Sequence, residues 1–381
     1  MSVPAYDLSP LLGIVGVGLL VAIVPLAWFR LRQRGAGPAA RLRALTLLTL
    51  FLCFDLVMLG AYTRLSDSGL GCPDWPGCYG YSSPVGAHSA ITDAQAAAPL
   101  GPVTHEKAWV EMAHRYAATA IGLLIATLAV LSIVAARRGK VRVPPWWPVA
   151  TLAWICVQGA FGALTVTMNL YPAIVVLHLL GGMVLLALLA LQFERYEPRA
   201  LLLSAPLRAG VVIVAALAAM QIALGGWVST NYAVLACREF PTCQGVWWPD
   251  TDFASGFVLR RPLGMDGAGG ALPYQALTAI HMAHRVGALL LLPALMLLAW
   301  RLFMRGRDAT PWAAALVAIV AWQAASGVGN LLLGWPLIAA VAHTAGSAAL
   351  VVVMTLLLAR TRSTRPQPAA RWPARAGTAT S

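Results

Sequence analysis

Nine long apolar runs constrain the fold of this 381-residue chain more than any other feature of its sequence. A helix needs about 20 apolar residues to cross a bilayer, and within lipid a helix satisfies its own backbone hydrogen bonds. Only 11% of the residues are charged, against about 25% in soluble domains, which argues against a soluble fold. The predicted spans are 11–32, 42–62, 108–136, 146–167, 172–193, 207–230, 276–304, 311–332 and 336–360.

The distribution of lysine and arginine predicts the orientation of these spans. Most of the 27 basic residues fall in segments that lie inside if the N-terminus lies outside, beginning with the cluster from Arg30 to Arg43. The positive-inside rule therefore favours this orientation in a bacterial inner membrane. The net charge of +13 then anchors the chain to anionic lipids of the bilayer, and we expect no nucleic-acid partner.

The second half of the chain repeats the first. Segments 60–80 and 225–245 align without gaps at an offset of 165 residues, and Glu111-Met-Ala-His114-Arg115 matches His281-Met-Ala-His284-Arg285. The predicted fold is an all-α polytopic membrane protein with two tandem, pseudo-symmetric four-helix transmembrane bundles, 42–200 and 201–360. Four is an even number of spans, so an axis along the membrane normal should relate the bundles. Residues 1–41 add an N-terminal transmembrane helix with a basic linker, and 361–381 are expected to be a disordered cytoplasmic tail.

Four of the seven histidines lie within predicted spans, each about one to two helical turns below the outer surface. They are His114 and His178 in the first bundle and His284 and His343 in the second. An iron between facing helices takes one axial imidazole from each side, so this arrangement predicts two bis-histidine haems. A lone histidine in a span often only bonds a backbone group, but four at one depth in a repeat favour metal ligation. Zinc would need further ligands near each pair.

Arg115 and Arg285 directly follow two of these histidines. A guanidinium pairs bidentately with a carboxylate, and a haem brings two propionates, so both arginines are candidate propionate ligands. The alternative is that they extend to the membrane surface and bind no ligand.

Glu111 breaks the symmetry of the repeat, because His281 stands at its place in the second half. It lies three residues before His114 and so on the same helix face. A buried carboxylate beside one haem and not the other predicts one chemically active site and one that relays electrons, with Glu111 as the catalytic proton-transfer group. The alternative is a carboxylate that complements the helix dipole.

Two cysteine pairs with the same spacing, Cys72-x5-Cys78 and Cys237-x5-Cys243, lie in predicted outer loops. On the oxidising side of the membrane each pair is expected to form a local disulfide. Stapling of the loop is the favoured role, and redox exchange with the haem is the alternative.

Three glutamines within spans, Gln158, Gln221 and Gln323, each stand four residues before a glycine. They are interpreted as polar helix-packing positions.

Together these residues resemble the haem A synthase family, bacterial membrane-integral enzymes that oxidise haem O to haem A. The stretch from Gly60 to Cys78 is similar to the segment that ends the family's first helix and begins its first outer loop. Glu111-Met-Ala-His114-Arg115 is similar to its Glu-x-x-His-Arg motif. The resemblance covers about residues 42–360, and the helix at 11–32 is additional to the family's eight-helix core.

The resemblance implies the reaction and the two haems. His114 and His178 would hold haem O, whose methyl group becomes a formyl group through a hydroxymethyl intermediate, and Glu111 would assist proton transfer. His284 and His343 would hold a permanent haem b. The product haem A would serve cytochrome oxidase, and the haem sites would lie near the periplasmic face. A haem O synthase and an electron-transfer partner are the expected protein partners, and a homo-oligomer is compatible with the sequence.

Two rival functions fit part of the sequence. A di-haem b-type electron-transfer cytochrome without substrate chemistry explains the histidines but not Glu111 opposite His281. A transporter with a parallel repeat would place its site near the midplane in broken helices, whereas the polar groups here gather near one face.

Overall fold

The computed structural model describes residues 9–141 and 143–363. Within this part of the chain, nine helices are long and apolar enough to cross a membrane, which confirms the predicted polytopic all-α class. They are α1 (Ser9–Arg32), α2 (Pro38–Leu65), α4 (His105–Arg137), α5 (Trp146–Thr167), α6 (Pro172–Tyr196), α7 (Ala205–Thr230), α9 (Tyr274–Phe303), α10 (Thr310–Leu332) and α11 (Leu337–Arg360).

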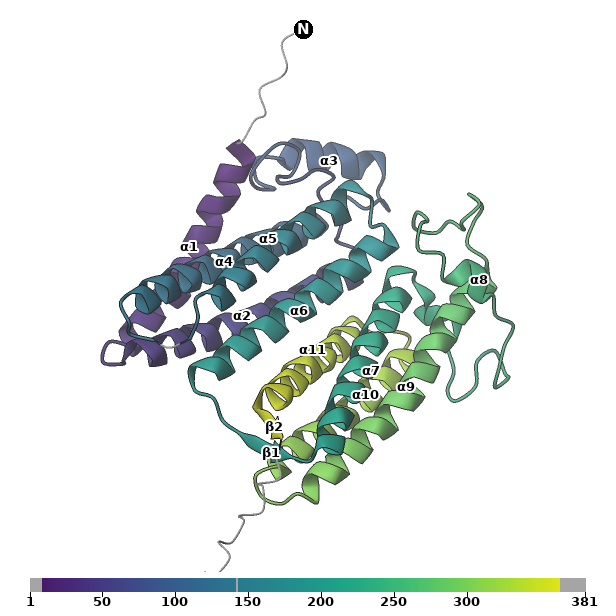
Figure 1. Ribbon diagram of the computed structural model, residues 1–381. Helices are drawn as coiled ribbons and strands as arrows, with labels where there is room; N and C mark the ends of the chain where they lie inside the picture. Colours follow the sequence, from purple (N-terminus) through teal and green to yellow (C-terminus); the bar gives the residue numbers. More distant parts are fainter. Residues whose placement is uncertain (1–8, 142, 364–381) are drawn as a thin grey trace, which may run out of the picture.

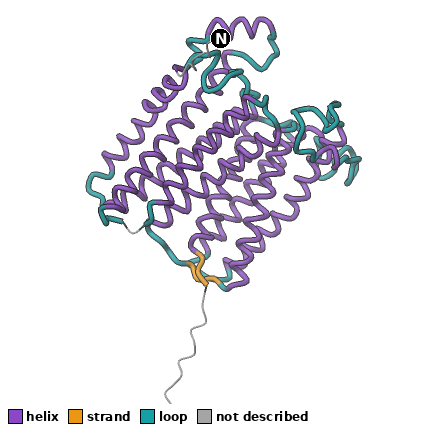
Figure 2. The backbone as a smooth tube through the Cα atoms, turned by 45° about the horizontal axis from the view of Figure 1, so that its top comes forward, coloured by secondary structure: helices purple, strands orange, loops and turns teal. Residues whose placement is uncertain are grey.

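The remaining elements are short. The outer loops after α2 and α7 contain α3 (His88–Ala97), the 3-10 turn η1 (Ala233–Ala236) and α8 (Phe253–Gly256). At the other end of the helices, β1 (Leu201–Leu203) pairs in parallel with β2 (Thr361–Ser363) (Figure 2). Residues 361–363, expected to begin a disordered tail, therefore form a strand that joins the end of the chain to the linker between the bundles. The rest of that segment, 364–381, lies outside the described residues.

Helix α2 begins earlier than the apolar run predicts. Its first residue is Pro38, which suits a first turn because proline has no N–H to leave unpaired there. Residue 42, the expected start of the first bundle, therefore lies inside the helix. The Arg41 side chain donates to the carbonyls of Gln33 and Arg34 at 3.0 and 2.6 Å, so the first turn of α2 binds the end of the segment that precedes it.

The helices form two groups, α1 to α6 and α7 to α11 (Figure 1). Helices α2, α4, α5 and α6 contact one another around the first bundle in the same order as α7, α9, α10 and α11 around the second. Between the bundles, α6 packs on α7, and the equivalent helix α11 packs on α2. This equivalence is what a pseudo-two-fold axis requires, as the parallel repeat predicts.

Residues that are equivalent in the two halves meet across this axis. At the outer side, Arg64 donates to the Ser229 carbonyl at 2.7 Å, and the Tyr232 hydroxyl donates to Asp67 at 2.6 Å. Both pairs are 165 residues apart, which is the offset of the repeat at this point. These contacts fasten the outer ends of the two bundles together.

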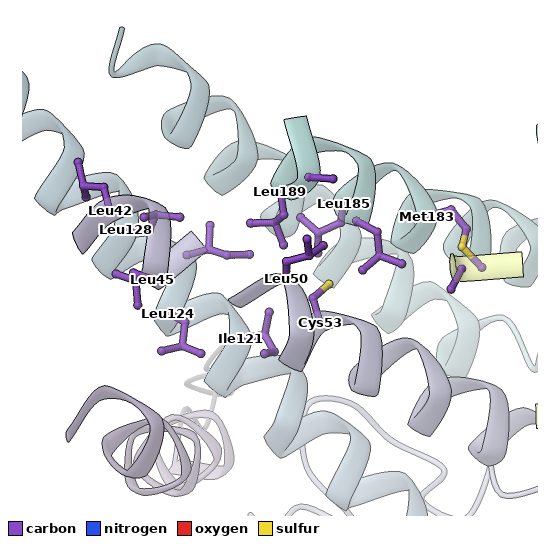
Figure 3. Close-up of a cluster of buried hydrophobic side chains, with 14 of the residues drawn as sticks. Leu42, Leu45, Leu50, Cys53, Ile121, Leu124, Leu128, Met183, Leu185 and Leu189 are labelled. Carbon is purple, nitrogen blue, oxygen red and sulfur yellow. The ribbon is translucent and has the colours of Figure 1, made fainter. Parts of the chain in front are cut away.

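The apolar core of the first bundle lies toward the inner ends of its helices, and part of it is drawn in Figure 3. It is built from the first half of α2 and the later parts of α4 and α6, and the second bundle has an equivalent core. The outer ends, where the histidine-bearing helices begin, are thereby left for polar side chains. The labelled core residues are Leu42, Leu45, Leu50, Cys53, Ile121, Leu124, Leu128, Met183, Leu185 and Leu189.

The additional helix α1 packs against α4 of the first bundle. Its Gly18 approaches Thr119 so closely that a Cβ atom there would come within 2.6 Å of the threonine methyl. Small residues allow such close approach of helices in membranes. Helix α1 therefore covers the helix that carries Glu111 and His114, whereas the equivalent α9 has no such cover among the described elements.

Candidate metal centre

The structure brings the four predicted histidines together in two pairs. His114 on α4 and His178 on α6 belong to the first bundle, and His284 on α9 and His343 on α11 to the second. The rings of His284 and His343 have their centres 6.4 Å apart. Metal–imidazole bonds of about 2 Å on both sides of one iron would separate the ring centres by about 6 Å. The second pair therefore fits an iron bound between its rings.

A glycine on the neighbouring helix lies against each imidazole. A Cβ atom at Gly60 or Gly225 would stand 3.0 Å from Cε1 of His114 or His284. At Gly162 or Gly327 it would stand 3.3 Å from Cε1 of His178 or His343, respectively. A side chain at any of these positions would press on the ring, so the glycines keep space open around each candidate ligand.

Three of the four imidazoles also have a glutamine partner. The Nε2 atoms of Gln158 and Gln221 lie 3.2 and 3.0 Å from Nδ1 of His178 and His284. Both amides also donate to the backbone carbonyl of the same histidine, at 2.5 and 2.9 Å. These glutamines were predicted as packing positions, and the structure gives them a more specific place beside the candidate ligands.

His343 completes the set of three. With the Gln323 amide turned so that its nitrogen faces acceptors, it donates to Nδ1 and to the carbonyl of His343, at 3.2 and 3.0 Å. The Ser326 hydroxyl lies 3.0 Å from the same Nδ1. In each case the glutamine stands four residues before the glycine of the same site, so a repeated Gln-x3-Gly pattern was the sequence signal for this arrangement.

His114 is the exception. Its Nδ1 is shielded from solvent and has no hydrogen-bond partner among the described residues. Its glycine, Gly60, is present, but the position four residues earlier is Leu56. In the repeat Leu56 corresponds to Gln221, so the first bundle lacks one of the four amides.

The two arginines hold the outer loops. Arg115 donates to the carbonyls of Asp74 and Pro76 at 2.9 and 3.0 Å. Arg285 donates to the equivalent part of the second loop, the carbonyls of Glu239 and Thr242, at 2.6 and 2.9 Å. Each arginine thus fastens a loop to the helix that carries the neighbouring histidine. Their role as propionate ligands stays a prediction.

Both predicted disulfides are present. Cys72 is bonded to Cys78, and Cys237 to Cys243. Each bond closes the loop whose carbonyls the arginine binds. The disulfides therefore support the frame around the histidines, in line with the predicted stapling role.

Glu111 is buried, with 4% of its surface exposed. One carboxylate oxygen accepts from the backbone N–H of Cys72 at 2.8 Å, and the other forms an ion pair with Arg115. His281, which takes its place in the second bundle, is also buried and donates from Nδ1 to the Ala233 carbonyl at 2.9 Å. The structure thus places a charged pair beside the first histidine pair and a neutral hydrogen bond beside the second.

The donor set suits haem iron better than a bare metal ion. Within the described residues, no group of three or more His, Cys, Asp or Glu side chains gathers to hold a metal. Two facing imidazoles leave four equatorial positions for ligands that the protein does not supply, and a porphyrin supplies four.

The fold and these sites define a polytopic membrane protein with a pair of candidate axial ligands in each of two related bundles. Comparison with known proteins gives the family. The family model described as cytochrome oxidase assembly protein matches residues 43–355. The chain therefore belongs to that family.

Several curated relatives carry the name haem A synthase. The Shewanella oneidensis protein is 37% identical over 81% of this chain and 93% of its own length. The proteins of Halalkalibacterium halodurans and Caulobacter vibrioides are each 28% identical, over 76% and 82% of this chain and 86% and 93% of their own lengths. The matched region spans both bundles, which agrees with the resemblance inferred from the motifs.

Proposed function

We propose that this protein is a haem A synthase, which oxidises a methyl group of haem O to a formyl group through a hydroxymethyl intermediate and so supplies haem A for cytochrome oxidase. Family membership and the names of the relatives support this reaction. The observation that carries the proposal is one buried acidic group beside one of two otherwise similar histidine pairs. A symmetrical electron carrier has no need of such a difference.

The first bundle is assigned to the substrate and the second to a resident haem. His114 and His178 bind the iron of haem O, next to Glu111. His284 and His343 would hold haem b, which would supply a one-electron relay. The 6.4 Å between the ring centres of His284 and His343 supports their assignment as a ligand pair.

Glu111 is the proposed proton-transfer group. Its carboxylate accepts a hydrogen bond from the Cys72 N–H and forms an ion pair with Arg115. These contacts hold it in one place at the outer end of the bundle, where His114 also lies. Oxidation of a methyl group to an aldehyde releases protons, and a carboxylate held in this bundle could accept them and pass them on. Arg115 and Arg285 lie where they can also bind haem propionates.

The sites are assigned to the periplasmic side of a bacterial inner membrane. All four histidine-bearing helices begin at the side that carries the two disulfide loops, and disulfides persist on the oxidising side of a membrane. A haem O synthase is the expected source of the substrate. An electron-transfer partner is expected as well.

The experiment is the analysis of extracted haem by mass spectrometry, with Glu111→Gln compared with the wild-type protein in cells that supply haem O. The variant keeps the shape and the Cys72 contact of Glu111 but cannot take up a proton as the carboxylate does. General acid–base groups contribute about 100-fold or more to a rate. We therefore expect both haems to remain bound while formation of haem A falls by at least about that factor.

Glu106→Gln is the matched control, because Glu106 is an exposed acid in the first turn of the same helix. Its haem A yield should equal that of the wild type. Full activity of Glu111→Gln would remove the catalytic assignment. Haem b alone in the wild-type protein would favour the electron-transfer cytochrome.

A further inference from the structure

We propose that a polar pocket at the outer end of the first bundle is the opening through which the carboxylate edge of haem O enters, and that Lys107 binds a propionate there. The equivalent place in the second bundle is filled by apolar side chains, which close the site of the resident haem. This inference rests on the proposed function, since it names an entrance and a binding residue of the substrate site. It concerns access to that site and not the oxidation itself.

The pocket lies between the outer ends of α2 and α4 and has a volume of about 320 Å³. Tyr62 and Ser68 line it from α2 and the residues that follow, and Lys107 and Val110 line it from the first turns of α4. Val110 stands four residues before His114 and Lys107 seven, so both lie on the helix face that carries His114. At 1.5 Å per residue they lie about 6 and 10 Å outward of His114 along the helix axis.

The second bundle has one apolar cluster at the equivalent place. Phe257, at the end of α8, packs against this cluster, and the Trp227 indole N–H donates to the Gly256 carbonyl at 2.9 Å. Only 5% of Trp227 is exposed. Helix α8 packs on α9 (Figure 1) and so covers the end at which the first bundle is open. In the repeat, Tyr62, Ser68, Lys107 and Val110 correspond to four members or neighbours of the cluster, Trp227, Ala233, Leu277 and Ile280.

The ammonium group of Lys107 is available to a ligand. An ammonium has three N–H donors, and within the described residues that of Lys107 reaches only the Gly101 carbonyl, at 3.5 Å. The guanidinium of Arg115, by contrast, already binds Glu111 and the loop carbonyls. A carboxylate forms a stronger hydrogen bond with a cationic donor than with a neutral one. A propionate that extends outward from a haem at His114 would therefore find a cation in Lys107.

The opposite wall of the pocket offers hydroxyl groups. Ser66 also lines the pocket, and its hydroxyl oxygen lies 2.8 Å from that of Ser68. Hydroxyls can rotate to donate to a carboxylate. Glu106 borders the pocket as well, but it is exposed to solvent. Because solvent and salt screen an exposed charge, Glu106 opposes a bound carboxylate only weakly.

The difference between the bundles suits their proposed roles. In each turnover haem O enters the first bundle and haem A leaves it, so this site needs an opening. The resident haem of the second bundle stays in place, and the apolar cluster over its outer end would have to move before that haem could leave. Moving buried apolar side chains into water is unfavourable, which slows such a release.

Titration with haem O tests the role of Lys107. Protein made in cells without a haem O synthase is expected to carry haem b alone, so the first bundle is free to bind added haem O, and the haem absorbance reports binding. Lys107→Met keeps a long side chain and removes its charge, and the dissociation constant should rise about three- to tenfold. The dimethyl ester of haem O, whose propionates carry no charge, should bind the wild type and the variant equally.

Lys140→Met is the matched control, because Lys140 is an exposed lysine just beyond the inner end of α4, and it should bind haem O as the wild type does. Lys107→Arg keeps the charge and should restore most of the affinity. Equal affinity of Lys107→Met and the wild type for haem O would overturn the assignment. So would an equal loss of affinity for haem O and for its dimethyl ester, because that loss would not depend on the carboxylates.

The opening itself is tested by the rates of uptake and release. Val110→Trp places a large side chain in the pocket, so the association rate of haem O should fall several-fold. Val130→Trp, at an exposed position of the same helix, should leave that rate unchanged. Phe257→Ala thins the apolar cluster of the second bundle and should speed the transfer of haem b to apomyoglobin. An unchanged association rate in Val110→Trp, or an unchanged transfer rate in Phe257→Ala, would overturn the proposed opening and closure.

These results are separable from the test of the proposed function. Binding and its rates are measured without turnover, whereas the function is tested by the chemical identity of the extracted haem. Haem O that is bound and oxidised with no effect of Lys107→Met would overturn this inference alone. A wild-type protein that does not bind haem O would remove the proposed function, and the inference with it. If Val110→Trp does not fold, Lys107→Met and Phe257→Ala decide the question.

Discussion

In both bundles the histidines lie at equivalent positions, but the polar groups around them differ. Each imidazole lies against a glycine, and each arginine binds the carbonyls of a disulfide loop. The first bundle has Glu111 and Leu56 where the second has His281 and Gln221. Under the proposed function, the buried acid Glu111 marks the bundle in which the reaction takes place.

The largest effect is expected when one candidate ligand is removed from each bundle. His178→Ala and His343→Ala each delete one axial imidazole, and loss of a ligand should lower haem affinity by more than the 10- to 100-fold expected for a lost ligand partner. We expect His178→Ala to lose the haem O and haem A fraction, and His343→Ala to lose haem b. Mass spectrometry of the extracted haem measures both.

Loss of haem b from His178→Ala with haem O retained would exchange the roles of the two bundles. Loss of both haems from either variant would mean that the sites are not independent. Helix content by circular dichroism distinguishes these results from a failure to fold.

Because Arg115 forms an ion pair with Glu111, replacing Arg115 should destabilise the protein more than replacing Arg285. Both side chains are nearly buried, with 9% and 5% of the Arg115 and Glu111 side chains exposed. Arg115→Gln therefore leaves a buried carboxylate without its counter-charge, which costs about 3 kcal/mol or more. Arg285→Gln loses hydrogen bonds to the loop carbonyls without leaving such a charge. Thermal unfolding of the two variants should show the larger loss for Arg115→Gln.

The double variant Glu111→Gln/Arg115→Gln is the control for this effect. It removes the carboxylate together with its partner, so its stability should return to near that of Arg285→Gln. Equal losses in Arg115→Gln and Arg285→Gln would show that the arginines serve only to hold their loops.

The apolar runs of the sequence were sufficient to predict the spans, and the depth of the four histidines to predict their pairing. The partners of the histidines could not be predicted in the same way. The pattern Gln-x3-Gly is visible at Gln158, Gln221 and Gln323, but its meaning depends on which helices are neighbours and which faces they turn to each other. Spans that are apolar on most faces carry little information about that rotation.

The arginines show a second limit of the sequence. The propionate role of Arg115 stays a prediction, but the sequence did not predict that its guanidinium binds Glu111 and the carbonyls of Asp74 and Pro76. Those carbonyls belong to an irregular loop, whose path depends on the disulfide and on packing against the helix ends. No periodic pattern in the sequence predicts the path of such a loop.

The smallest expected effect concerns the junction at which the two bundles meet. Asp67 and Tyr232 occupy equivalent positions, and the Tyr232 hydroxyl donates to Asp67 at 2.6 Å. Burial, with a contribution from Asp67, raises the pKa of Tyr232 above its usual value, although the charge of Arg64 opposes this. Because folding favours the neutral hydroxyl, its contribution to stability is fully present below the usual tyrosine pKa of about 10. This contribution is lost as the pH rises through the higher pKa of the folded protein.

Tyr232→Phe should therefore lower the free energy of unfolding by about 0.5–1 kcal/mol at pH 8, and the difference from the wild type should shrink above about pH 10. Thermal unfolding of both proteins at pH 8 and above about pH 10 measures this difference. A difference that does not change with pH would mean that the hydrogen bond from the Tyr232 hydroxyl to Asp67 does not stabilise the junction.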